Sequence, residues 1–255
     1  YAGPDDSLRA HNAGIMMVSA MGKRNIKNAK VVALGYPETY GGYHLSIAAF
    51  RDAIEDSDID LIDSLHLDWG SQNAFNAMVR SIDDFVRTGD TLHGVYAMDD
   101  DILNGAYQAL ADRGMLDSVT LVGTVCNGAR ELLDDGRQFG TTVQSPFLEA
   151  VLAIDSASEY LQTGVLSQKV RFTPNPILIG SSFETMILEF LGETYVADDL
   201  CTWKLQQQRS NGLNDVEAAD DICVWIDCLY IPNGLVMAGY TMAVSIHISE
   251  LTRPD

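Results

Sequence analysis

The chain has 255 residues, of which 47% are hydrophobic, enough to build a buried core in one large domain or two small ones. Its 36 acidic residues outnumber 16 basic ones and give a formal net charge of −20 at pH 7. A surface of that sign repels phosphate backbones and anionic lipid headgroups, so it disfavours nucleic-acid binding and electrostatic attachment to membranes.

A helical pattern comes first, and strands and helices then alternate from residue 30 to 144. The first helix is predicted within residues 1–22, where Leu8, Ile15, Val18 and Met21 share one apolar face. The first strand, KVVALGY at 30–36, has the continuous apolar run of a parallel strand buried on both faces. Further strands are predicted at 61–67, 93–98, 119–122 and 140–143, and helices at 45–54, 72–88, from about 100 towards Gly114, 129–135 and 146–161. This alternation predicts an α/β fold with a parallel sheet and helices on both faces.

Three consecutive carboxylates, Asp99, Asp100 and Asp101, stand where a predicted strand ends and a helix begins. Acidic side chains cap free amides at a helix N-terminus and are favoured there by the helix dipole. The carboxyl end of a strand is also where ligands bind in α/β sheets, so both interpretations stay open. A cation site formed with Asp68 is a weaker alternative, because consecutive side chains rarely all point at one ion.

The pattern changes after about residue 185. Short extended segments are predicted at 170–172 and 177–179, and residues 186–255 form an extension of unknown fold. Within it, residues 222–248 are strongly apolar, but the part after Gly234, residues 235–248, is too short for the roughly 20 residues that span a bilayer. We expect this segment to be buried against another part of the chain or a partner, with the start of a membrane segment as the alternative.

Catalytic and metal-binding patterns are not found. The five histidines are scattered, no Cys-x-x-Cys pair occurs, and no nucleophile–base motif is present, so the sequence predicts no enzyme, no metal site and no cofactor. The cysteines are Cys126, Cys201, Cys223 and Cys228. A disulfide in an oxidising compartment is expected among the last three, with Cys126 standing apart.

Seven segments in order carry a resemblance to a known family. They are PDDSLRAHNAG, VVALG followed by a helix with AAF, LDW, YAMDDDILNGAYQAL, LVG, DDGRQFGTTVQSP and ASEYLQTG. Residues 1 to about 180 resemble the later two-thirds of a type I periplasmic binding protein of the ribose/galactose sugar-binding kind, related to the LacI-type repressor core. A repressor itself is disfavoured, because the acidic balance opposes DNA binding.

The resemblance implies two α/β lobes that clamp a sugar at the carboxyl ends of their strands. It assigns residues 1–22 to a remnant of the N-terminal lobe and 23–144 to a complete C-terminal lobe. A return helix follows at 145–168 and a hinge crossing at 169–185. The first half of the N-terminal lobe is missing from this correspondence, and the chain does not start with Met, so we expect a processed or truncated piece of a longer protein.

Four ligand-binding residues carry over by this resemblance. Asp5 and Asp99 correspond to polar residues that bind sugar hydroxyls, although the family has Asn where Asp99 stands. Trp69 corresponds to the aromatic residue that stacks on the sugar, and Gln144 to the glutamine of a Gln-x-Pro hinge. Each also has a structural explanation: Asp5 and Asp99 as helix caps, Trp69 as a packed aromatic, and Gln144 as a hinge residue that satisfies backbone groups.

Two expected contacts are absent. Ser46 stands where the resemblance expects an arginine, and Val125 where it expects an aspartate. Loss of a forked donor and a strong acceptor makes ribose-like specificity doubtful. The sequence therefore predicts an extracytoplasmic module that binds a sugar or polyol for ABC transport or sensing. The alternatives are a non-catalytic structural or assembly subunit, or a receptor ectodomain with a membrane protein or other subunit contacting residues 222–248.

Overall fold

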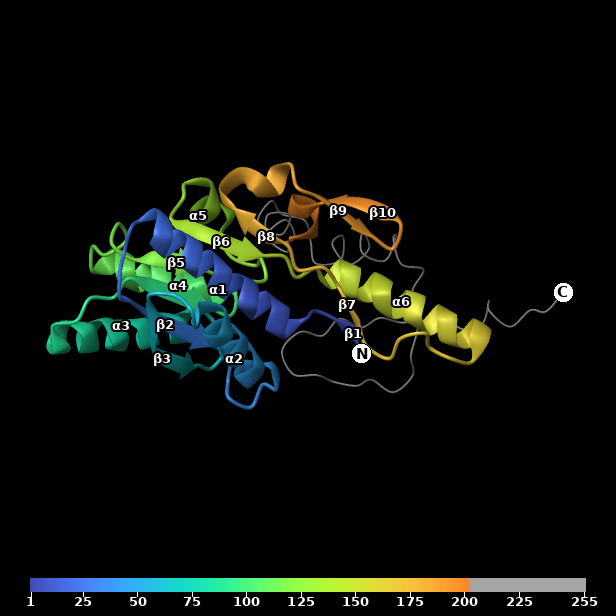
Figure 1. Ribbon diagram of the computed structural model, residues 1–255, viewed down its shortest axis with the longest axis horizontal. Coiled ribbons are helices and arrows are strands. Elements are labelled where there is room, and N and C mark those ends of the chain that lie inside the picture. The colour runs from blue at the N-terminus through green and yellow to red at the C-terminus, as the bar shows by residue number, and fades with distance from the viewer. Residues whose placement is uncertain (202–255) are drawn as a thin grey trace. The chain divides into compact units, whose positions relative to one another are not determined.

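The computed structural model describes residues 1–201, apart from the side chains of Ser181 and Phe183 (Figure 1). The predicted apolar segment 222–248, with Cys223 and Cys228, lies outside the described residues.

A six-stranded sheet forms the centre of the described chain. Its order is β3-β2-β4-β5-β6-β8; the first five strands are parallel, and β8 runs antiparallel to β6. The strands are β2 (Ala29–Gly35), β3 (Ile59–His66), β4 (Gly94–Ala97), β5 (Thr120–Val122), β6 (Gln138–Thr142) and β8 (Ile177–Ile179). The predicted α/β fold is confirmed, and the predicted strands agree with the observed ones within a few residues.

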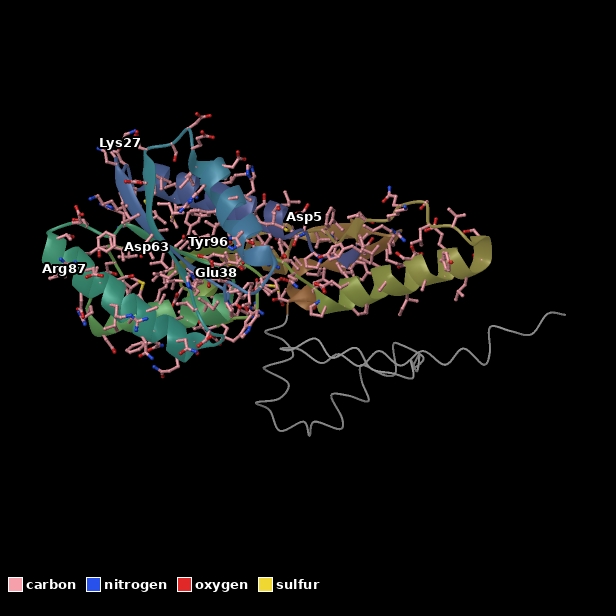
Figure 2. All side chains as sticks on the ribbon, turned by 90° about the horizontal axis from the view of Figure 1, so that it is seen from below. Asp5, Lys27, Glu38, Asp63, Arg87 and Tyr96 are labelled. Atoms are coloured by element: carbon pink, nitrogen blue, oxygen red, sulfur yellow. A yellow bond between two sulfur atoms is a disulfide. The ribbon has the colours of Figure 1, made fainter. Side chains whose placement is uncertain are left out.

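Helices cover both faces of this sheet (Figure 2). One pair packs on one face and another pair on the opposite face. The first pair is α1 (Asp6–Lys23) and α2 (Gly42–Ile54), the second is α3 (Ser71–Thr88) and α4 (Asp100–Asp112), and the short α5 (Arg130–Asp134) follows β5. Phe50 of α2 stacks on Tyr96 of β4 with ring centroids 4.3 Å apart. Within the described residues, no helix is long and apolar enough to cross a membrane.

The position of α1 differs from the expected lobe assignment. Residues 1–22 were expected in the N-terminal lobe, but α1 lies on the six-stranded sheet and buries Met16 and Met17 in its core. Glycines in the strands make room for these side chains, since a Cβ at Gly94 would lie 2.8 Å from the Met17 sulfur. An apolar helix face predicts burial but does not say against which sheet, so the sequence pattern alone left the lobe undecided.

A small second group of elements includes the N-terminus. The strand β1 (Ala2–Gly3) pairs in parallel with β7 (Arg171–Phe172), and the long helix α6 (Pro146–Thr163) packs beside β1. Pro146 stands in the first turn of α6 and Gly164 ends it with a left-handed φ of 73°, as the sequence predicts.

The first part of the predicted extension folds as a hairpin. Strands β9 (Ile187–Phe190) and β10 (Glu193–Val196) are antiparallel, and the turn residues Leu191 and Gly192 both have positive φ. Short 3-10 helices occupy Gly180–Glu184 and Ala197–Leu200. Hydrophobic side chains of the hairpin region join a second core that includes Val143 and Leu148.

A disulfide closes this second core, and it corrects the cysteine prediction. Cys126 pairs with Cys201, 75 residues away, and Cys126 therefore does not stand apart. Both residues are buried, Cys126 in the loop after β5 and Cys201 just after the last 3-10 helix. Sequence spacing could not show this pair, because it depends on how the hairpin folds back onto the sheet.

Candidate functional site

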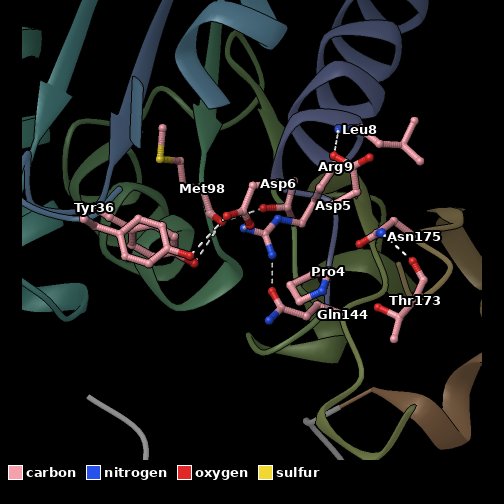
Figure 3. Close-up of polar contacts among 12 residues, drawn as sticks. Pro4, Asp5, Asp6, Leu8, Arg9, Tyr36, Met98, Gln144, Thr173 and Asn175 are labelled. Atoms are coloured by element: carbon pink, nitrogen blue, oxygen red, sulfur yellow. Dashed lines mark hydrogen bonds and ion pairs between the residues drawn. The ribbon is translucent and has the colours of Figure 1, made fainter. Parts of the chain in front are cut away.

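Three of the four predicted ligand residues follow the carboxyl ends of parallel strands. Trp69 comes after β3, Asp99 after β4 and Gln144 after β6. Because these strands are parallel, their carboxyl ends form one edge of the sheet, the edge at which α/β folds bind ligands. Asp5 immediately precedes α1, and Arg9 of that helix donates to Gln144 Oε1 (Figure 3).

Asp5 and Asp99 both cap helices. The Leu8 amide donates to Asp5 Oδ1 at 2.9 Å, and the Ile102 amide donates to Asp99 Oδ1 at 2.6 Å. The structural explanation therefore holds for both residues. A carboxylate has two oxygens, so a cap on one of them is compatible with a ligand contact at the other.

Asp99 is held in a buried environment that changes its acidity. It is only 7% exposed, and this burial raises its pKa to about 6. The hydrogen bond from the Ile102 amide opposes that rise in pKa. Near neutral pH the side chain is therefore mostly a carboxylate, and it becomes a hydrogen-bond donor in mildly acidic solution.

Arg9 is a buried residue of this edge that the sequence did not reveal. It is 2% exposed, donates to Asp6 Oδ1 at 2.7 Å and also donates to Gln144 Oε1 (Figure 3). Asp6 in turn accepts from the Tyr40 hydroxyl at 3.3 Å. The Arg9 guanidinium thus orients the Gln144 side chain. The only sequence signal for this role was that Asp6 and Arg9 stand three residues apart in the first turn of a helix, a spacing that favours an ion pair.

This guanidinium comes from a different place than the resemblance implies. Ser46, the position of the expected arginine, is buried in α2. Arg9 reaches the strand edge from α1 instead. Arg9 is buried and bonded to Asp6 and Gln144, so it holds these two side chains in place, and the absence of an arginine at Ser46 stands.

Trp69 belongs to an aromatic group with Tyr36 and Tyr40. Its ring centroid lies 4.6 Å from that of Tyr36 and 5.9 Å from that of Tyr40, and the two tyrosine centroids are 4.9 Å apart. Tyr36 is buried and donates to the Met98 carbonyl at 3.2 Å (Figure 3), whereas Trp69 is 47% exposed. Trp69 is therefore partly packed and partly open, which the structural explanation and the ligand role both allow.

The three consecutive aspartates separate in the structure. Asp100 is fully buried away from solvent, accepting from Thr141 Oγ1 at 2.7 Å and Gln138 Nε2 at 2.8 Å, and burial raises its pKa to about 8. Asp101 is half-buried on α4, and its burial also raises its pKa. Over residues 1–201, no three His, Cys, Asp or Glu side chains are placed to share one ion as they stand, so the cation alternative at Asp68 and Asp99–Asp101 has no support.

The loop after β5 has no acidic side chain where the resemblance expects one. Val125 and the following Cys126 have φ angles of 82° and 53°, a left-handed region that side chains with a Cβ rarely adopt. Thr124 fixes the start of this loop by donating to the Met98 carbonyl at 2.6 Å. The absence of an acceptor at Val125 therefore stands, and nothing at that position replaces it.

Residues 1–164 match the family described as periplasmic binding protein domain. The chain belongs to this family. No curated protein sequence matches the chain.

Solved structures of periplasmic binding proteins share the fold. A galactofuranose-binding protein has a TM-score of 0.63 at 20% identity, with 70% of this chain and 60% of that one covered. A periplasmic solute-binding protein of an ABC transporter from Actinobacillus succinogenes, with bound D-allose, has a TM-score of 0.61 at 20% identity, covering 71% and 60%. A fructose-binding periplasmic domain of a hybrid two-component system has a TM-score of 0.63 at 20% identity, covering 86% and 65%.

The chain matches only part of each of these solved structures. This periplasmic binding protein chain spans about 60% of the length of the first two solved structures. The six-stranded sheet, Gln144 after β6 and the β1–β7 pair all lie within the described residues, and the assignment of these parts to two lobes stays a prediction.

Proposed function

We propose that this periplasmic binding protein binds a sugar or polyol at the carboxyl edge of its sheet, for uptake or sensing outside the cytoplasm. The observation that carries the proposal is the partly open Trp69 ring, set at the same strand edge as Asp99 and Gln144. An indole face suits the CH surface of a sugar ring, and carboxylates and amides suit its hydroxyls.

Each residue has a distinct proposed role. Trp69 stacks on the sugar, with Tyr36 supporting it from behind at 4.6 Å. Asp99 accepts a sugar hydroxyl, and Asp5 does so with the oxygen that does not cap α1. Gln144 donates through its amide nitrogen, because Arg9 already donates to its oxygen. Arg9 holds Gln144 in position and does not itself contact the sugar in this proposal.

The family and its solved relatives support a binding role over a catalytic one. They are named for binding, and one relative belongs to an ABC transporter while another is a periplasmic domain of a hybrid two-component system. The disulfide Cys126–Cys201 supports an oxidising compartment outside the cytoplasm. The absent acceptor at Val125 supports a ligand other than ribose, since one strong hydroxyl contact is missing.

An assembly role is the second candidate. Its support is the outer part of α6, where Tyr160 and Leu161 are exposed together with Val165 just beyond the helix. Apolar surface of this kind is typical of a face that meets another protein. Size determination by light scattering discriminates the two candidates: an assembly subunit forms a defined oligomer, and a stable monomer contradicts this role.

Calorimetric titration of the protein with a panel of pentoses, hexoses and polyols tests sugar binding. Trp69→Ala removes the stacking surface, and we expect at least tenfold weaker binding of any sugar that the protein takes. Val86→Ala is the matched control, because Val86 is an exposed apolar residue at the far end of α3, and we expect it to leave affinity unchanged. Equal affinities for both variants would contradict a role for Trp69.

A further inference from the structure

The loop between β5 and α5, residues 123–129, bonds to two parts of the proposed ligand edge; we call it the β5 loop. Thr124 Oγ1 donates to the Met98 carbonyl at 2.6 Å, just after β4. The Val125 carbonyl accepts from the main-chain amide of Gln144 at 3.4 Å. The β5 loop therefore bonds to one predicted ligand residue and to the residue that precedes another.

Asn127 joins the β5 loop to the start of α4. Its Oδ1 accepts from the Asp100 amide at 2.9 Å and from the Asp101 amide at 3.3 Å. Gly128 packs on the same turn so closely that a Cβ there would lie 2.5 Å from the Asp100 Cβ. Asp99 caps this turn as well, so the β5 loop and the Asp99 carboxyl share the free amides of one helix start. A shift of the loop therefore moves the turn that orients Asp99.

The disulfide lies in the middle of these contacts. Cys126 is the residue between Val125 and Asn127, and it is bonded to Cys201. Its own amide donates to Thr141 Oγ1 at 3.4 Å on the neighbouring strand β6. Both cysteines are buried, at 0% and 3% exposed, so the bond is enclosed in the second core.

The backbone of the β5 loop needs such support. Val125 and Cys126 have φ angles of 82° and 53°, a conformation that residues with a Cβ adopt only where the surroundings hold them in it. A covalent bond at the second of these residues supplies that support. A disulfide that served only to anchor the hairpin would not have to attach at the residue between the two loop contacts.

We propose that the Cys126–Cys201 disulfide clamps the β5 loop and thereby positions Asp99 and Gln144 for ligand binding. Neither cysteine contacts the ligand, because both are buried and act through the loop, so they are positioning residues. The clamp itself needs no ligand, whereas its effect on affinity rests on the proposed sugar site.

NMR relaxation of the unliganded full chain tests the clamp without any sugar. In the double variant Cys126→Ser/Cys201→Ser, we expect the backbone order parameters of Asn127 and Gln144 to fall below about 0.6, the range of flexible backbone. Ala29, at the start of β2 and the opposite end of the sheet, should keep a rigid value of about 0.85. A disulfide that only stabilises the hairpin would leave all three values unchanged.

Calorimetric titration measures the effect on the site. Cys126→Ser/Cys201→Ser should bind any sugar that the wild type binds at least fivefold more weakly, at a temperature at which circular dichroism shows each protein to be folded. Cys223→Ser/Cys228→Ser is the matched control, because it removes the other two cysteines of the chain by the same substitution. We expect it to keep the order parameters of the wild type and an affinity within twofold.

A further variant keeps the disulfide and breaks the link between the β5 loop and α4. Asn127→Ala removes the oxygen that accepts from the Asp100 and Asp101 amides. We expect lower order parameters at both amides and at least threefold weaker sugar binding. This variant decides the question if Cys126→Ser/Cys201→Ser does not fold.

Each outcome separates the clamp from the sugar site. Unchanged order parameters in the deciding variant overturn the proposal, and so does a cysteine control that loosens the loop equally. If the order parameters fall but the variant binds sugar as tightly as the wild type, the loop does not position the site and the proposal is overturned as well. If they fall and the wild type binds no sugar, the proposed sugar function fails while the clamp stands.

Discussion

Asp99 and Asp100 are adjacent and both buried, but their side chains point in different directions and have different hydrogen-bond partners. Asp99 caps α4 at the strand edge, whereas Asp100 points under the loop after β5 and bonds Thr141 and Gln138. A Cβ at Gly123 would lie 1.8 Å from Asp100 Oδ1, so this carboxyl fills the space that the glycine leaves. Asp100 therefore joins α4 to the sheet, whereas a ligand contact at Asp99 stays a prediction.

The buried Asp100 makes stability depend on pH. Its pKa is raised from 3.8 to about 8, so between those values the folded protein holds a proton that the unfolded chain releases. The free energy of unfolding therefore falls as pH rises, by up to about 1.4 kcal/mol per pH unit for one proton. Asp99 adds to this fall only up to about pH 6.

Asp100→Asn removes the titrating group while keeping partners for Gln138 and Thr141. We expect its free energy of unfolding between pH 6 and 8 to fall less steeply than that of the wild type, by about 1 kcal/mol per pH unit. Urea denaturation at pH 6, 7 and 8 measures this slope. Asp112→Asn, at the exposed end of the same helix, is the control, and identical slopes for Asp100→Asn and wild type would refute the explanation.

Replacing Arg9 should also lower the free energy of unfolding. Arg9→Met leaves Asp6 and Gln144 without their buried donor, and we expect it to lower the free energy of unfolding by about 3 kcal/mol. Arg9→Lys keeps the charge but not the fork, and should lose an intermediate amount. Chemical denaturation measures both, and a loss below about 1 kcal/mol for Arg9→Met would show that the network contributes little.

The sequence predicted the role of a residue correctly where that role depends only on its neighbours in the chain. The caps at Asp5 and Asp99 follow from a short polar residue before a helix, and both are observed. Arg9 and the tyrosines beside Trp69 were missed, because their roles depend on contacts across the fold. The ligand roles of Asp5, Trp69, Asp99 and Gln144 stay predictions.

At the scale of elements, the alternation of strands and helices was sufficient to predict the sheet. The pattern did not show which sheet α1 covers, nor that β8 joins the sheet in the antiparallel direction. Both depend on long-range packing that periodicity does not contain. The hairpin of β9 and β10 was missed for another reason: its strands are only four residues long, too short for a clear alternation of apolar and polar side chains.

The disulfide is what fixes this hairpin region covalently to the loop after β5. Replacing Cys126 and Cys201 by serine opens a loop of 75 residues, and we expect a loss of about 4 kcal/mol in the free energy of unfolding. Limited proteolysis should then cut the hairpin before the central sheet. Alkylation of both cysteines in the unreduced wild-type protein would contradict the pairing, and peptide mapping without reductant checks it directly.

For the molecule as a whole, family membership and fold agree with the resemblance that the sequence showed. The strand edge collects the partly open Trp69 ring, the buried Asp99 carboxyl, the half-buried Gln144 amide and the Arg9 guanidinium, within a strongly acidic protein. This composition suits a neutral, hydroxyl-rich ligand better than an anion, because carboxylates at the edge outnumber the one guanidinium.

Chemical-shift mapping by NMR during titration with a sugar that binds in the calorimetric panel tests this account most directly. We predict that the largest shifts occur at the Trp69 indole and the Gln144 side-chain amide, with smaller ones at Tyr36 and at the Ile102 amide that Asp99 caps. Shifts confined to the outer helices, or no shifts with any pentose, hexose or polyol, would contradict a sugar site at the carboxyl edge of the sheet.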